Sequence, residues 1–300
     1  MRSSQQSHLS VIASAIGASA AFAGTFTLIR LLAPDLPALE IVFFRNLMGF
    51  FLVLPLMGAA RFRNVRASSH RLYVARACLG FVAMGLWYIG VAALPLNNST
   101  ALSFISPLFA TLAAMIFLGE HVEGSRWGGL VVGFLGVLLV LRPGLYAVSW
   151  PELSIIAAAV FVGINTVIVK HLTRAEPARA ITAYMSLYMV PFSALAVIPV
   201  WTTPPLHAWP ALVGVAVLTT AGNLLLTRTL AAWNTSSVVS LDFVRLPIAS
   251  VLAWLVFGEV ADAWAWIGGT VIVAATAFSA RGRTGAPVVA AGPVEITPHR

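Results

Sequence analysis

Long apolar segments follow one another along nearly the whole of this 300-residue chain. A helix of about 20 apolar residues crosses the roughly 30 Å hydrocarbon core of a bilayer. The segments are apolar throughout, whereas the strands of a membrane barrel alternate apolar with polar residues. Charged residues make up 9% of the chain, against roughly 25% in a soluble domain. The pattern therefore predicts an all-α integral membrane protein.

The apolar segments predict ten transmembrane helices. Their ranges are 9–32, 38–58, 72–94, 98–118, 127–142, 152–172, 179–200, 209–231, 236–257 and 263–281. Residues 1–8 and 284–300 are polar or rich in proline and glycine, and we expect them to form tails.

Basic residues are distributed unevenly between the two sides of the predicted membrane. If the N-terminus is cytoplasmic, the cytoplasmic side holds Arg61, Arg63, Arg66, Arg71, Arg126, Lys170, Arg174, Arg179, Arg281 and Arg283. Cytoplasmic loops are enriched in Lys and Arg, so we predict a multi-pass protein of the cytoplasmic (inner) membrane with both termini inside. Arg30 and Arg142, at outer helix ends, are the main exceptions. Topology thus accounts for the net charge of +8, and the bilayer rather than nucleic acid is the expected partner.

The two halves of the chain repeat each other. Gly119-Glu120 precedes Gly258-Glu259 by 139 residues, and Pro107 precedes Pro247 by 140. The series predicts two five-helix units, 9–142 and 152–281. Because each unit has an odd number of helices, the two copies insert in opposite orientations. Such inverted repeats are typical of secondary transporters, which bind substrate near the midplane between the repeats.

Residues in and around the fourth predicted helix resemble a known family. Leu96-Asn97-Asn98-Ser99-Thr100-Ala101-Leu102-Ser103-Phe104-Ile105-Ser106-Pro107-Leu108-Phe109, together with Phe117-Leu118-Gly119-Glu120 and Trp127-Gly128-Gly129, is similar to the EamA unit of the drug/metabolite transporter superfamily. The resemblance implies two inverted EamA units that carry a small-molecule substrate by alternating access. It favours export of amino acids or related compounds. Uptake of a larger metabolite, of the S-adenosylmethionine or riboflavin type, is the alternative.

Two charges lie deep in the predicted helix 236–257. Asp242 and Arg245, at i and i+3, are close enough to touch. A charge near the bilayer centre costs at least ~2.5–3.5 kcal/mol, so such residues usually face a cavity or each other. We expect both to border the substrate pathway; an internal ion pair that only locks the helix is the alternative. The repeat pairs them with Ser103 and Ser106 at a spacing of 139 residues.

Small polar and aromatic residues complete the predicted pathway. Ser103 and Ser106 share one helix face with Ser99, where their hydroxyls contact either substrate or their own helix. The other candidates lie within further helices: Trp87, Tyr88, Asn165, Asn223 and Thr227. Arg45, about two turns into helix 38–58, is expected to extend its side chain toward the membrane interface.

Prolines and glycines suggest mechanical roles. Pro107 and Pro247 lie inside predicted helices, where proline removes a backbone hydrogen bond and favours a kink; each is either a hinge or a static bend. The Gly-Glu pairs are expected to terminate helices, with the glycine left-handed and the carboxylate bound to loop amides. A gate at the membrane face is their alternative role. Gly129, Gly133 and Gly136 predict close helix packing.

Other classes of function lack their signals in this sequence. There is no Gly-x-Ser-x-Gly, no His-Glu-x-x-His and no Gly-Lys-Ser/Thr phosphate loop, so neither an enzyme nor an ATP-driven pump is predicted. Cys78 is the only cysteine, and no metal or cofactor is expected. A receptor or scaffold that does not transport stays open as an alternative, and nothing indicates the oligomeric state.

Overall fold

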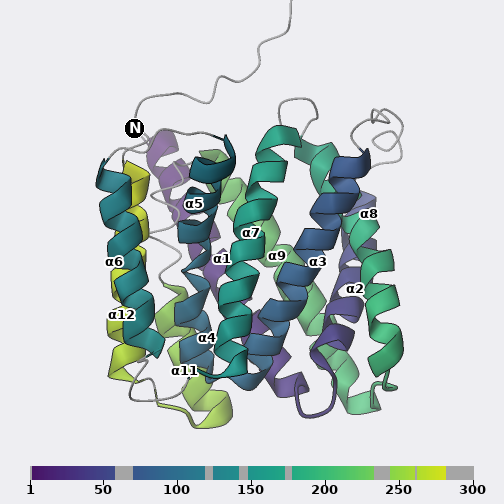
Figure 1. Ribbon diagram of the computed structural model, residues 1–300. Helices are drawn as coiled ribbons and strands as arrows, with labels where there is room; N and C mark the ends of the chain where they lie inside the picture. The colour runs from purple at the N-terminus through teal and green to yellow at the C-terminus, as the bar shows by residue number, and fades with distance from the viewer. Residues whose placement is uncertain are drawn as a thin grey trace, which may run out of the picture.

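The computed structural model describes residues 2–57, 70–118, 124–141, 148–172, 178–232, 244–260 and 262–281. These residues form a bundle of roughly parallel and antiparallel helices without a strand (Figure 1). The α-helices are α1 Arg2–Leu32, α2 Ala38–Met57, α3 His70–Ala93, α4 Leu96–Ser103, α5 Ser106–Leu118, α6 Gly124–Leu141, α7 Trp150–Leu172, α8 Ala178–Val197, α9 Trp209–Ala232, α11 Arg245–Phe257 and α12 Ala263–Arg281. Two short 3₁₀ helices, η3 Ile198–Val200 and η4 Leu206–Ala208, connect α8 to α9.

Most predicted helices agree with the observed ones to within a few residues. The first helix begins at Arg2 instead of residue 9, so residues 2–8 are helical where we expected a tail. The segment 284–300 lies outside the described residues. Of the predicted helix 236–257, only the part from Arg245 onward is described.

The predicted helix 98–118 is wrong as a single helix, because it is divided into α4 and α5. Residues 104–105 form a turn between them, with Phe104 N–H bonded to Ala101 O at 3.2 Å and Ile105 N–H to Leu102 O at 3.1 Å. The break falls just before Pro107, the second residue of α5. Proline has no N–H to offer the carbonyl four residues earlier, which is that of Ser103, and its ring crowds that carbonyl. The chain therefore kinks there.

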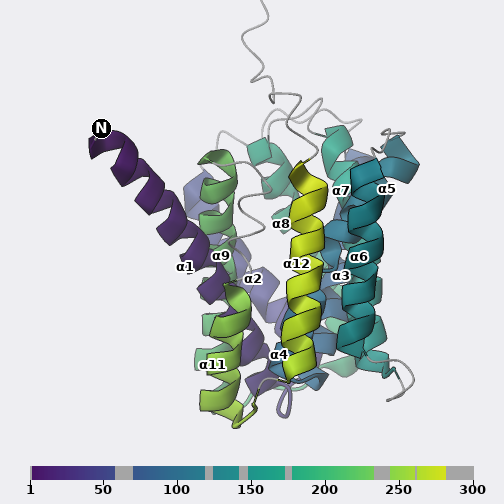
Figure 2. The same cartoon turned by 90° about the vertical axis from the view of Figure 1, so that its left-hand side faces the viewer.

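Helices of the first half pack mainly on helices of the second half. α1 lies beside α9, α3 beside α7, α2 beside α8 and α6 beside α12 (Figures 1 and 2). Glycines allow the backbones of two of these helices to approach closely, which is the role predicted for Gly133 and Gly136. A Cβ atom on Gly136 would lie 2.9 Å from the Gly268 carbonyl, and one on Gly268 would lie 2.7 Å from the Gly136 carbonyl.

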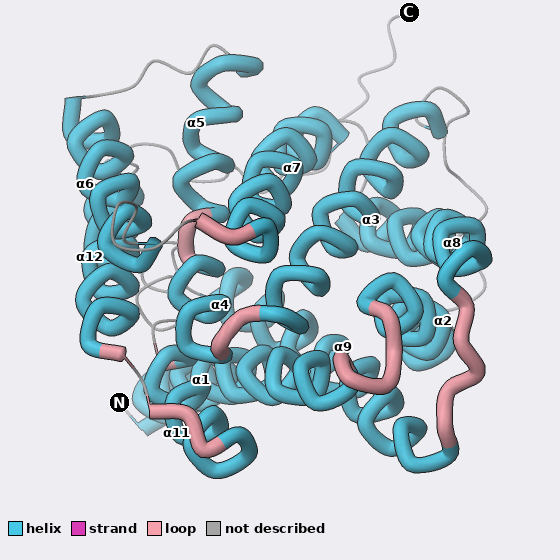
Figure 3. The backbone as a smooth tube through the Cα atoms, turned by 60° about the horizontal axis from the view of Figure 1, so that its bottom comes forward, coloured by secondary structure: helices cyan, strands magenta, loops and turns pink. Residues whose placement is uncertain are grey.

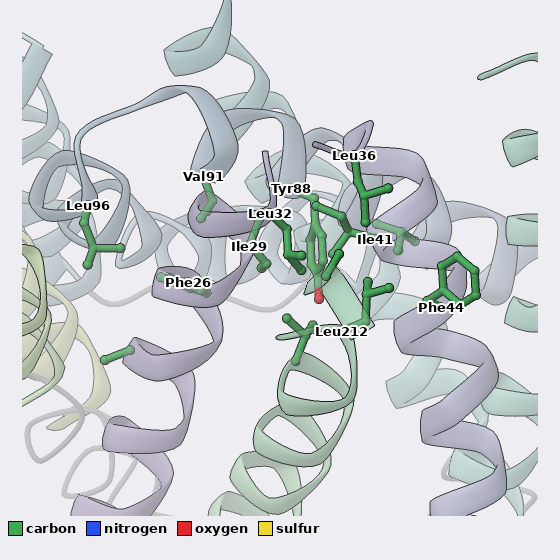
Figure 4. Packing of buried hydrophobic residues seen from close by; sticks show 14 of the residues in the cluster. Phe26, Ile29, Leu32, Leu36, Ile41, Phe44, Tyr88, Val91, Leu96 and Leu212 are labelled. Carbon is green, nitrogen blue, oxygen red and sulfur yellow. The ribbon is translucent and has the colours of Figure 1, made fainter. Parts of the chain in front are cut away.

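The largest hydrophobic cluster lies toward one end of the bundle. The connections from α1 to α2, from α3 to α4 and from α8 to α9 lie at this end, which comes forward in Figure 3; we call it the 33–37 end. The cluster joins α1, α2, α3, α4, α9 and α11 (Figure 4), and its fully buried members include Ile29, Ile41, Val91, Leu96 and Leu212.

Four of the described helical segments are long and apolar enough to cross a membrane. They are Ser10–Leu32, His70–Ala93, Leu96–Phe117, which includes the kink, and Leu206–Leu226. Apolar segments of 10–17 residues occur in five more places. Many large apolar side chains face outward, among them Phe51, Phe117, Phe134, Leu195 and Trp254. Such a surface suits lipid and not water.

Candidate functional site

Arg245 lies among three phenylalanine rings. Its guanidinium carbon is 5.1 Å from the ring centre of Phe22, 5.9 Å from that of Phe26 and 5.4 Å from that of Phe104. Its Nη1 atom donates a hydrogen bond of 3.3 Å to Ser103 Oγ. A guanidinium over ring faces at this range is attracted by their electron density. We call these five residues the Arg245 cluster.

The breaks in two helices place the Arg245 cluster. Arg245 is the first residue of α11, and Ser103 is the last residue of α4. Phe104 lies in the turn between α4 and α5, while Phe22 and Phe26 come from one face of α1 at i and i+4. Trp87 of α3 extends the aromatic surface, since its ring centre is 5.7 Å from that of Phe26.

The helix-four serines bond their own helix, one of the two roles considered for them; contact with substrate stays a prediction. The hydroxyl of Ser99 donates to the Leu96 carbonyl at 3.1 Å, and that of Ser103 donates to the Thr100 carbonyl at 2.6 Å. Ser103 also accepts the hydrogen bond from Arg245. Ser106 is the partly exposed first residue of α5, beyond the kink, so it does not continue the helix of the other two.

A second polar group surrounds Tyr88 of α3. Tyr88 is 5% exposed and lies among the hydrophobic residues of α1, α2 and α9 in Figure 4. Its hydroxyl is hydrogen-bonded to Thr219 of α9, whose Oγ1 lies 3.4 Å from Thr25 Oγ1 of α1. Three helices are thus joined by polar contacts inside an apolar cluster.

Arg45 contributes to this second group, contrary to the expectation that it reaches for the membrane interface. Its Nη1 atom donates to Asn46 Oδ1 at 2.7 Å and contacts Met84 Sδ of α3 at 3.3 Å. The side chain therefore turns toward α3 within the bundle. The sequence did not predict this orientation of Arg45, because its distance from the helix end allows the side chain to reach either the membrane interface or the interior of the bundle.

Of the remaining candidates, Asn165 and Asn223 are described in full, whereas Asp242 and the side chain of Thr227 are not. Asn165 of α7 is half-exposed, and its Oδ1 atom has no hydrogen bond to the described residues. Asn223 of α9 is exposed. Asp242 lies outside the described residues, as does the side chain of Thr227. The pairing of Asp242 with Arg245 therefore stays a prediction.

The Gly258-Glu259 pair ends α11 as the capping interpretation predicts. Gly258 is left-handed at φ 67°, and the N–H groups of Gly258 and Glu259 bond the carbonyls of Trp254 at 3.0 Å and Ala253 at 3.1 Å. The bond from the Gly258 N–H to the Trp254 carbonyl is that of an αL cap. The Glu259 carboxylate accepts the Leu96 N–H at 3.3 Å and pairs with Arg30.

No group of three or more potential metal ligands occurs among the residues that the structure describes. The candidate site combines aromatic rings with a guanidinium group and hydroxyls.

Comparisons with known proteins identify the family of the chain. The model of the EamA-like transporter family matches residues 9–142 and again 149–281. A riboflavin transporter of Rhizobium johnstonii is 30% identical over 82% of this chain and 82% of its own length. The pseudopaline exporter CntI of Pseudomonas aeruginosa is 28% identical over 90% and 96%. An S-adenosylmethionine uptake transporter of Rickettsia bellii is 26% identical over 83% and 86%.

The fold also has a counterpart among solved structures. One crystal structure superimposes with a TM-score of 0.59 at 17% identity, over 88% of this chain and 95% of the other. At that identity, the likeness concerns the fold alone.

Proposed function

Because the chain belongs to the EamA-like transporter family, we propose that this membrane protein takes up a ring-containing metabolite of the riboflavin or S-adenosylmethionine type. It works as a secondary transporter in the cytoplasmic membrane, with both termini inside. Transport proceeds by alternating access between two inverted five-helix repeats, which correspond to residues 9–142 and 152–281.

The Arg245 cluster carries the proposal on substrate. Three phenylalanine rings surround a guanidinium, which is a strong hydrogen-bond donor. Aromatic faces bind planar rings by stacking, and the guanidinium suits a carbonyl or carboxylate on the same molecule.

Helix neighbours support an inverted repeat. In the repeat, α1 is equivalent to α7, α3 to α9, and α5 to α11. The neighbouring pair α1–α9 therefore corresponds to the pair α7–α3, and the pair α1–α11 corresponds to the pair α7–α5. All four pairs are in contact. α5 and α11 also begin at equivalent positions, Ser106 and Arg245, which are 139 residues apart. Such symmetry supports alternating access around a site between the halves.

Export is the second candidate function. The relative named as a pseudopaline exporter aligns over a larger share of both chains than the riboflavin transporter of Rhizobium johnstonii does. The expectation of amino-acid export, made from the sequence alone, stays a prediction, since none of these three relatives is named for an amino acid.

Counterflow in proteoliposomes tests the proposed substrate. Vesicles made with the purified full chain are loaded with unlabelled riboflavin, S-adenosylmethionine or a mixture of amino acids, and uptake of the same labelled compound is measured. We expect exchange of riboflavin or S-adenosylmethionine above that of empty vesicles. Exchange of amino acids only would overturn the proposal in favour of the earlier expectation, and exchange of none would favour a receptor or scaffold.

The role of the Arg245 cluster has its own test. Arg245→Gln alone leaves the predicted partner Asp242 as an uncompensated charge, which is costly in itself. The paired change Asp242→Asn with Arg245→Gln removes both charges at similar volume. We expect this variant to reach the membrane and to bind the transported compound about tenfold or more weakly. Normal affinity and rate would make the pair structural.

A further inference from the structure

Arg45 is a partly buried cation without a carboxylate partner among the described residues. It is the eighth residue of the 20-residue helix α2, which puts its backbone about 4 Å from the middle of the helix at ~1.5 Å per residue. Within the described part of the chain, no carboxylate lies within ion-pairing distance of it. Glu40, on the same helix, instead accepts hydrogen bonds from Thr202 N–H at 3.1 Å and Thr202 Oγ1 at 2.6 Å.

Asn46, next to Arg45, carries a donor without an acceptor among the described residues. Its side-chain oxygen accepts the Arg45 hydrogen bond, which fixes the orientation of the amide. Asn46 is 6% exposed, and its Nδ2 atom has no hydrogen-bond acceptor among the described residues. A buried donor without an acceptor costs about 1–3 kcal/mol, and proteins rarely leave one without a reason. Among the described residues, Arg45 thus lacks a carboxylate, and the buried Asn46 amide beside it lacks an acceptor.

The surroundings of Arg45 connect it to the Arg245 cluster. Its contact Met84 belongs, with Phe26, Trp87 and Tyr88, to one hydrophobic cluster. Phe26 is also a ring that faces Arg245. The two guanidinium groups thus border the same hydrophobic cluster, Arg45 of α2 through Met84 and Arg245 of α11 through Phe26. We call its rings of Phe26, Trp87 and Tyr88 the aromatic cluster.

We propose that Arg45 and Asn46 form an acceptor-binding subsite, which takes an anionic or carbonyl group of the transported molecule while its ring lies on the aromatic cluster. Buried ionisable groups inside a membrane bundle commonly mark a substrate pathway. The planar guanidinium can bind two oxygens at once, and Asn46 adds a third donor. The inference rests on the proposed function for the identity of the ligand but not for the existence of the subsite.

The subsite is tested first by equilibrium binding of two ligands to purified protein. Riboflavin offers the carbonyl edge of a neutral ring, and S-adenosylmethionine offers a carboxylate. Arg45→Gln is expected to raise the Kd of whichever ligand the unaltered chain binds by about tenfold or more. Arg45→Lys restores binding of a carboxylate, for which a point charge suffices, but not of a two-oxygen carbonyl edge. Arg71→Gln is the matched control, because Arg71 is exposed at the start of α3.

Two outcomes of this binding experiment are decisive. Unchanged affinity in Arg45→Gln, with protein that is folded and monodisperse, overturns the subsite. If the unaltered chain binds neither ligand, the proposed function is refuted. The subsite is then tested by a second measurement.

The second measurement needs neither a variant nor the natural substrate. Phenylglyoxal modifies accessible arginines, and mass spectrometry of peptides follows the rate at Arg45. Benzoate joins a ring to a carboxylate, whereas benzyl alcohol has the ring alone. We expect benzoate to slow modification of Arg45 several-fold, benzyl alcohol to have no effect, and Arg71 to react equally in all samples. The inference is overturned if phenylglyoxal does not modify Arg45 at all, or if benzoate does not slow its modification.

Discussion

Arg30 of α1 and Glu259, which follows α11, form a two-point ion pair at the 33–37 end of the bundle. Arg30 Nη1 donates to Glu259 Oε2 at 2.5 Å, and Nη2 donates to Oε1. The same carboxylate accepts the N–H of Leu96 at the start of α4, and the guanidinium carbon lies 4.6 Å from the ring centre of Phe257. Glu259, which follows α11, thus connects that helix with α1 and α4. The pair also explains why Arg30 departs from the charge pattern of the loops.

Acid should weaken this ion pair. Burial alone would raise the pKa of Glu259, but the hydrogen bond and charge of Arg30 outweigh it and hold the pKa below 4.5. A carboxyl whose pKa is lowered by folding stabilises the folded state fully above its unfolded pKa and loses that contribution as pH falls through its folded pKa. We therefore expect the contribution to be complete at neutral pH and to decline below a pH of about 4.5.

A double-mutant cycle measures the pair. Thermal unfolding in detergent is followed for Glu259→Gln, Arg30→Gln and the double variant, at about pH 7 and again at about pH 3. We expect a coupling of about 1 kcal/mol at neutral pH, because the pair is only partly exposed, and almost none in acid. An equal coupling energy at both pH values would mean that the ion pair contributes nothing to stability through its charge.

The close contact between α6 and α12 should not tolerate a methyl group. Alanine at Gly136 would place a Cβ atom 2.7 Å from Ile272 Cγ1 and 2.9 Å from the Gly268 carbonyl. We expect Gly136→Ala to destabilise the protein by about 1–3 kcal/mol. Gly128→Ala, on the same helix, is the control, because its Cβ meets no atom within 4 Å. Equal unfolding temperatures for the two variants would contradict the predicted packing.

The two prolines should differ in their effect on transport. Alanine at 107 supplies an N–H that can bond the Ser103 carbonyl, and so allows α4 and α5 to join into one stiffer helix. Pro247 is the third residue of α11, where an N–H has no acceptor within the helix. If the kink is a hinge, Pro107→Ala slows counterflow several-fold with little change in Kd, and Pro247→Ala has a smaller effect. Unchanged turnover in both variants would leave the kink as a static bend.

Cysteine labelling in intact cells tests the orientation. Cys78 is exposed, so the variants are made in a Cys78→Ala background. A membrane-impermeant maleimide should label Thr203→Cys, which lies exposed in the connection between α8 and α9 at the 33–37 end. Ala67→Cys, in the arginine-rich loop outside the described residues, should react only after lysis. Labelling of the residue-67 variant in intact cells would reverse the proposed topology.

Much of the helical framework could be predicted from the chain alone, because each element depends on local properties. A run of apolar residues long enough to cross a bilayer must bond its backbone internally, so length and composition decide where helices lie. The left-handed Gly258 and the close approach at Gly136 were likewise predictable, because a glycine at a helix end or in a small-residue series has few other reasons to be there.

The constellation around the candidate site depended on tertiary structure. Arg30 and Glu259 are 229 residues apart, and no periodicity indicates that they meet. Phe22 and Phe26 face Arg245 only because α1 packs beside α11. The direction of Arg45 was decided by Met84 and Asn46, since a side chain of that length reaches either the interface or the interior. Sequence pattern specifies which face of a helix is polar, but the packing of helices decides which neighbour that face meets.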